Sequence, residues 1–169
     1  MALTRISNQS LTSVTALPAA ISTGKVLQSV SATDTTERNT TSNSFVTASN
    51  GLTVNITPSA TSSKIFVTVS TSLYSYTANK SVYLTLYRDS TNLGNAQGLI
   101  RSLNQDGTGG GAGTFAVLDS PNTTSQVTYQ LYIRLQDMDS DGGSVHIGSN
   151  IQGSTDYEPT HMTAFEIGA

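Results

Sequence analysis

The chain has 169 residues, a formal net charge of −3 and a pI near 5.1. Charged residues make up only 11% of it, whereas roughly 25% is usual for a soluble domain. Ser and Thr together supply roughly 30%. This length fits one domain, and the acidic balance without a basic patch argues against nucleic acid as a partner. The chain has no cysteine, which excludes a disulfide framework, a thiolate nucleophile and a cysteine-based zinc site.

Targeting and membrane signals are missing from the sequence. No stretch reaches the ~18 apolar residues of a membrane span, and "MALTRISNQS" lacks the apolar core of a signal peptide. We therefore expect that the protein does not insert into a membrane. We also expect that it is synthesised in a cytoplasm, without a signal for secretion. The hydroxyl-rich surface is nevertheless typical of proteins that work outside cells. A component of a virus particle released by lysis reconciles the two observations.

Residues 1–24 show no regular apolar period, and they contain Pro18 and Gly24, which argue against a continuous helix. We interpret this stretch as an extended N-terminal arm that precedes a single domain at residues 25–169. The alternative is a frayed tail.

From Lys25 onward, apolar and polar residues alternate with a period of two. The clearest predicted strands are "KIFVTVSTSLYSY" (64–76), "SVYLTLYRDS" (81–90) and "QVTYQLYIRLQ" (126–136). Further strands are predicted within 25–32, 44–49, 51–58, 114–120, 144–150 and 161–168. About eight to ten short strands, separated by turn residues and without a helical period, predict an all-β antiparallel jelly roll or β-sandwich.

Three tyrosines fall on the outward-facing positions of these strands: Tyr83, Tyr87 and Tyr132. Tyrosine is enriched at subunit interfaces, so they are interface candidates. The alternative is that they are scattered surface aromatics.

The segment "DMDSDGG" places Asp137, Asp139 and Asp141 at the first three ligand positions of an EF-hand loop. The twelfth position, which should be a bidentate Glu, is Gly148, and no helix flanks the segment. We favour a hairpin tip, because Asp and Gly suit tight turns. A looser calcium loop is the alternative, and no other cofactor or metal is expected.

The segment "DGTGGGAG" (106–113) lacks the Lys of a phosphate-binding loop and precedes a predicted strand. We predict an exposed loop there, and exposed loops often carry recognition. The receptor or partner candidates in the two loops are Asn104, Gln105, Asp106, Asp139 and Asp141. His146 and His161 match no metal-ligand spacing. We assign no catalytic residue and expect no enzyme, although a spatial Ser-His-Asp triad stays open.

Four phrases point to a family: "ALPAAISTGKVLQSVSAT" (16–33), "GLTVNITPSATSSKIFVTVS" (51–70), "LDSPNTTSQVTYQLYI" (118–133) and "MTAFEIGA" (162–169). They resemble small structural proteins of tailed bacteriophages, particularly phages of cyanobacteria and other aquatic bacteria. The strand order also resembles the trimeric jelly rolls of the C1q and tumour-necrosis-factor type, more weakly.

These resemblances imply a non-enzymatic protein on the virion surface. The first expectation is a homotrimeric, tail-fibre-like appendage whose loops contact a host-surface glycan. A capsid decoration (cement) protein that stabilises the head is the alternative. Residues 1–24 would then anchor the domain to a tail protein or the major capsid protein by strand addition. A carbohydrate- or calcium-binding β-module unrelated to virions is the more distant alternative.

Overall fold

The computed structural model describes residues 25–49, 51–105, 107, 109–137, 141–148 and 157–168. The predicted arm (1–24), Asp106 and Asp139 lie outside the described residues. The described residues form twelve strands and no helix, so the predicted all-β class is confirmed. The strands are β1 (Val26–Asp34), β2 (Arg38–Thr40), β3 (Val46–Thr47), β4 (Thr53–Ile56), β5 (Lys64–Ser75), β6 (Lys80–Arg88), β7 (Thr91–Asn92), β8 (Ile100–Asn104), β9 (Gly109–Asp119), β10 (Val127–Asp137), β11 (Val145–Ile147) and β12 (Thr160–Ile167).

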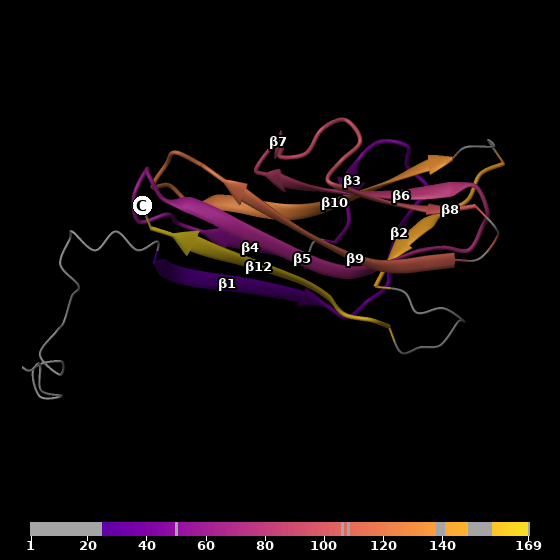
Figure 1. Ribbon diagram of the computed structural model, residues 1–169, viewed down its shortest axis with the longest axis horizontal. Helices are drawn as coiled ribbons and strands as arrows, with labels where there is room; N and C mark the ends of the chain where they lie inside the picture. The colour runs from indigo at the N-terminus through magenta and orange to yellow at the C-terminus, as the bar shows by residue number, and fades with distance from the viewer. Residues whose placement is uncertain are drawn as a thin grey trace, which may run out of the picture.

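The strands form two antiparallel sheets stacked as a sandwich (Figure 1). Sheet A has the order β1-β12-β5-β11-β2, with β9 on the other edge of β5. Sheet B has the order β3-β10-β6-β7, with β4 paired to β10 and β8 paired to β6. The chain changes sheets between β2 and β3, β4 and β5, β5 and β6, β8 and β9, β9 and β10, and β10 and β11, as in jelly rolls.

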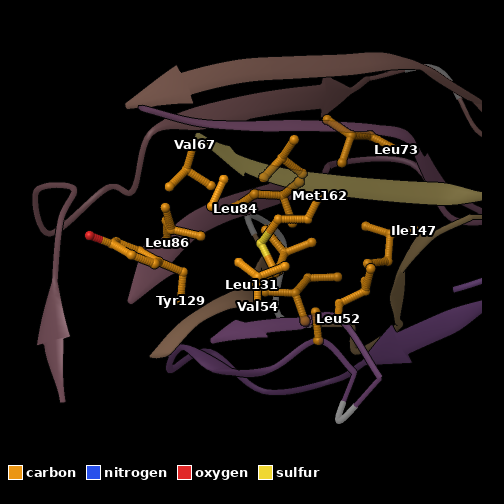
Figure 2. Packing of buried hydrophobic residues seen from close by; sticks show 14 of the residues in the cluster. Leu52, Val54, Val67, Leu73, Leu84, Leu86, Tyr129, Leu131, Ile147 and Met162 are labelled. Atoms are coloured by element: carbon orange, nitrogen blue, oxygen red, sulfur yellow. The ribbon is translucent and has the colours of Figure 1, made fainter. Parts of the chain in front are cut away.

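The core lies between the two sheets, and the period-two pattern of the long strands explains it. The apolar positions of β5, β6 and β10 are buried in it: Ile65, Val67, Val69, Leu73, Val82, Leu84, Leu86, Val127, Tyr129, Leu131, Ile133 and Leu135. Figure 2 shows Val67, Leu73 and Met162 of sheet A against Val54, Leu84 and Leu131 of sheet B. The alternation predicted from the sequence therefore places the correct face of each long strand inward.

The glycine run of "DGTGGGAG" differs from its prediction. Residues 109–113 are the first part of β9, paired with β5, and not an exposed loop. A Cβ at Gly110 would lie 2.2 Å from the Leu73 carbonyl oxygen and 2.6 Å from the Tyr74 ring. Glycine is therefore required for the close approach that lets β9 continue along β5. Strand β8 and the short strands β2 and β7 were also not predicted, because their segments show little alternation.

Candidate functional site

The outer face of sheet B carries a row of charged and aromatic side chains. Three residues stand opposite one another on adjacent strands: Arg101 on β8, Tyr83 on β6 and Arg134 on β10. Figure 1 shows these three strands in one layer. The strand register therefore places one arginine on each of the two strands that flank Tyr83.

The guanidinium group of Arg134 contacts two aromatic rings. Its guanidinium carbon lies 4.1 Å from the Tyr83 ring centroid and 5.2 Å from that of Phe45. One terminal nitrogen donates to the Gln97 side-chain oxygen at 2.7 Å. The Nε donor is buried and has no acceptor among the described residues. Cation–π contacts with two rings and this hydrogen bond hold the guanidinium group in place.

The predicted interface tyrosines come together on this same face, as the alternation predicts. Tyr87 and Tyr132 stack with centroids 4.0 Å apart and are half-buried. Tyr83 is only 3% exposed, since Arg134 covers its ring, and its hydroxyl donates to Gln136 at 2.5 Å. Only Tyr87 and Tyr132 therefore offer ring surface to a partner, and their interface role stays a prediction.

The segment between β7 and β8 makes two hollows on this face. Gly98 adopts a positive φ of 80°, and a Cβ there would lie 2.5 Å from the Leu84 carbonyl oxygen. Glycine at position 98 therefore allows the backbone of this segment to pack closely against β6. A cavity of about 500 Å³ lies on one side, lined by Tyr83, Arg101, Gln136 and Gln97 among others. A second, of about 510 Å³, is lined by Phe45, Tyr87, Arg134 and again Gln97.

The predicted calcium loop is organised around a lysine. The Lys80 side chain is fully buried, and its ammonium contacts Asp137 at 2.8 Å and also Asp141. The Gly142 amide donates to the second oxygen of Asp137 at 2.9 Å. The loop carboxylates thus already neutralise a protein cation. Among the described residues no group of three or more His, Asp or Glu side chains is placed to hold a metal.

Of the receptor candidates next to the glycine run, Asn104 has a structural role and Gln105 is exposed. Asn104 uses its side-chain amide to donate to the carbonyls of Ser75, at 3.3 Å, Thr77, at 3.0 Å, and Gly107. This amide therefore ties the β8–β9 connection to the end of β5. Gln105 is exposed, and its receptor role stays a prediction.

His146 lies in a hydrogen-bonded chain that the sequence did not identify. Its Nε2 is 2.7 Å from the Ser144 hydroxyl, and its Nδ1 contacts Glu37. This connectivity is that of a serine–histidine–carboxylate relay. A hydrolase also needs oxyanion donors and a substrate cavity. A third cavity lies beside Asp137 and Gly143. Ser144 and His146 line neither this cavity nor the two on sheet B, so we assign no catalytic role to them.

Glu166 on β12 is a buried carboxylate held by uncharged donors. It accepts hydrogen bonds from the Ser59 amide and hydroxyl, at 2.7 and 2.6 Å, and from Gln28 at 2.6 Å. Burial alone would raise its pKa, but these hydrogen bonds outweigh it and lower the pKa to about 2. The group is therefore ionised at neutral pH and joins β1, β12 and the β4–β5 connection.

Comparison with known proteins gives only distant structural similarity. No family model matches the chain. No curated protein matches its sequence. The crystal structure of the infectious bursal disease virus VP2 subviral particle is 13% identical, with a TM-score of 0.42 over 83% of this chain and 38% of that chain. The structure of the Gx strain of the same virus is 12% identical, with a TM-score of 0.41 over 85% and 37%. This chain thus spans less than two fifths of either protein, and its function must be inferred from its own surfaces.

Proposed function

We propose that this protein is a non-enzymatic structural component displayed on the surface of a bacteriophage particle, where copies of the chain assemble with one another as a tail-fibre-like trimer. The resemblance of four phrases to small tailed-phage structural proteins supports the viral setting. The observation that carries the proposal is an exposed apolar surface on the outer face of sheet A.

The apolar surface crosses three adjacent strands. Leu118 of β9, Phe66 of β5 and Phe165 of β12 stand opposite one another in register, and we call them the Phe66 row. Leu118 is 55% exposed and Phe66 is 37% exposed. At the same end of sheet A, Val26 and Leu27 begin β1 with exposures of 60% and 48%. Exposed apolar side chains on neighbouring strands of one sheet are typical of protein–protein interfaces.

The backbone next to this surface is also open to association. Within the described residues, β1 pairs only with β12, and β9 pairs only with β5. Each strand therefore leaves one edge without a strand partner, and symmetric assembly is a common way to cover such edges. A second copy of the chain could cover the exposed apolar side chains with its own apolar surface, and could pair with the free strand edges through its own edge strands.

Mass measurement of the purified protein tests the assembly. We expect native mass spectrometry and light scattering to give a trimer. The double substitution Phe66→Ser and Leu118→Ser should weaken it by about tenfold per side chain, because each removes buried apolar area. Leu103→Ser, which alters an exposed leucine on sheet B, is the matched control. A protein that is monomeric at high concentration would overturn the assembly proposal.

Immunogold labelling of intact particles tests the viral setting and separates the two roles. Gold on the tail supports the fibre-like appendage, and gold spread over the head supports the capsid decoration protein. Unlabelled particles from cells that make the protein would contradict both. Deleting residues 1–24 should abolish incorporation while leaving a folded domain, and normal incorporation would exclude the arm as the anchor to tail or capsid protein.

A further inference from the structure

We propose that the outer face of sheet B holds a binding site for a carboxylated sugar, of the uronic acid type, within an acidic glycan. The site consists of the two cavities that meet at Gln97, with Arg101 and Arg134 as the groups that receive the carboxylate. Its role as a receptor site rests on the proposed display function. The binding itself is a property of the isolated chain.

The first observation is the pairing of the arginines. Arg38 and Arg88 each form an ion pair, with Asp34 and Asp119, both at 2.8 Å. Arg101 and Arg134 have no carboxylate partner among the described residues, and neither cavity has an Asp or Glu in its lining. In a chain with 11 acidic and 8 basic residues, this face is therefore locally positive.

The second observation is that one of these cations is already oriented. Arg134 is fixed by two rings and by Gln97, and its buried Nε has no acceptor. Little conformational entropy is then lost when an anion binds. A planar guanidinium matches a carboxylate through two parallel hydrogen bonds, which makes a carboxylate the best-fitting anion. Arg101, which is exposed, offers the second positive charge across the Tyr83 ring.

The rest of the lining selects a sugar over a small inorganic anion. Gln97, Gln136 and Asn43 present amides, which both donate to and accept from hydroxyl groups. Tyr87 adds a partly exposed ring that suits the C–H face of a sugar. Hollows of about 500 and 510 Å³ on either side of one glutamine are large enough for successive sugar units. The net charge of −3 disfavours a nucleic acid, whose phosphates require a broadly basic surface.

Calorimetric titration of the full chain with alginate oligosaccharides, which are polymers of uronic acids, tests this site. We expect binding at physiological salt, and none by a neutral cello-oligosaccharide of the same length. Arg101→Gln should weaken binding by about tenfold, because it removes a charge-assisted hydrogen bond. Arg101 forms no hydrogen bond or ion pair among the described residues. Its guanidinium carbon lies 5.6 Å from the Tyr83 ring centroid, and because Arg101 is exposed we expect the fold to tolerate its replacement. Lys64→Gln removes one exposed charge from sheet A and should leave the affinity unchanged.

Equal binding of the neutral oligosaccharide would overturn the inference, and so would an equal loss of affinity in Lys64→Gln. Complete competition by sulfate at the same concentration as the sugar would overturn it too, because it would indicate a simple anion site. Absence of alginate binding would also overturn it while leaving the particle labelling unaffected. Failure of this site and failure of the proposed virion role are therefore distinguishable.

Discussion

The two ends of strand β5 accommodate a buried charge in opposite ways. Near Ser75, the fully buried Lys80 is neutralised by Asp137 and Asp141. Near Ile65, the fully buried Glu166 has no cationic partner among the described residues and is stabilised by Ser59 and Gln28. The first arrangement depends on opposite charges, and the second on aligned neutral donors. In both, the buried charge holds a loop segment against the core: Asp137 and residues 141–142 at one end, and Ser59 of the β4–β5 connection at the other.

Replacing the buried lysine should have the largest effect on stability. Lys80→Met keeps an apolar stem but removes the ammonium from between two carboxylates, so we expect a loss of about 3 kcal/mol in unfolding free energy. Urea denaturation at pH 7 measures it. The control is Lys64→Met on the exposed face, for which we expect less than about 0.5 kcal/mol. Equal losses in the two variants would mean that the ion pairs do not stabilise this end.

Replacing the buried glutamate should have a smaller effect, and one that depends on pH. The folded pKa of Glu166 is about 2, below its ordinary value of 4.5. A lowered folded pKa means that its contribution is fully present above pH 4.5 and is lost as the pH falls toward 2. Asp34, whose pKa is lowered from 3.8 to about 2, adds to the same acid-side loss.

The variant Glu166→Gln should lose about 1–2 kcal/mol at pH 7, because charge-assisted hydrogen bonds become neutral ones. It should also show a shallower decline in stability between pH 4.5 and 2 than the native chain. Urea denaturation at several pH values measures both, with the exposed Glu158→Gln as control. An unchanged acid-side slope would show that Glu166 does not titrate in this range.

Among the substitutions at the two buried charges and their partners, truncating the exposed Asp141 should reduce stability least. The Asp141 side chain is 56% exposed, whereas that of Asp137 is 13% exposed. Solvent screens the Asp141 contact, so we expect Asp141→Ala to cost less than about 1 kcal/mol. A loss as large as that of Lys80→Met would show instead that Asp141 is the main partner of the ammonium.

Added calcium should change the stability of the protein least of all. The ammonium of Lys80 lies against Asp137 and Asp141, and a divalent cation beside it would be repelled. We therefore expect calorimetric melting temperatures in millimolar calcium and in EGTA to agree within about 1 °C. A calcium-dependent rise that Asp137→Ala abolishes would re-establish the calcium loop that "DMDSDGG" suggests.

The local sequence pattern predicted most of the strands but few of the residues of the candidate site. Alternation in residues 126–136 placed Leu131 and Ile133 inward and Tyr132 and Arg134 outward, because side chains on a strand alternate between its faces. The glycines at 109–113 were predicted as a loop because no sequence pattern reveals a neighbour close enough to forbid a Cβ. The segment 91–104, which supplies Gln97 and Arg101 to the candidate site, gave no recognisable period.

Three features could be predicted from the sequence alone: the all-β class, the inward faces of the long strands and a hydroxyl-rich surface with few charges. These are local properties, set by side-chain size, polarity and the two-residue period. Which charged groups lie next to one another could be seen only in the folded chain. Lys80 is 57 residues from Asp137, and Arg101 meets Arg134 across Tyr83 only through the register of three strands. Such pairings depend on how distant strands align, and the alternation within each strand carries no information about that alignment.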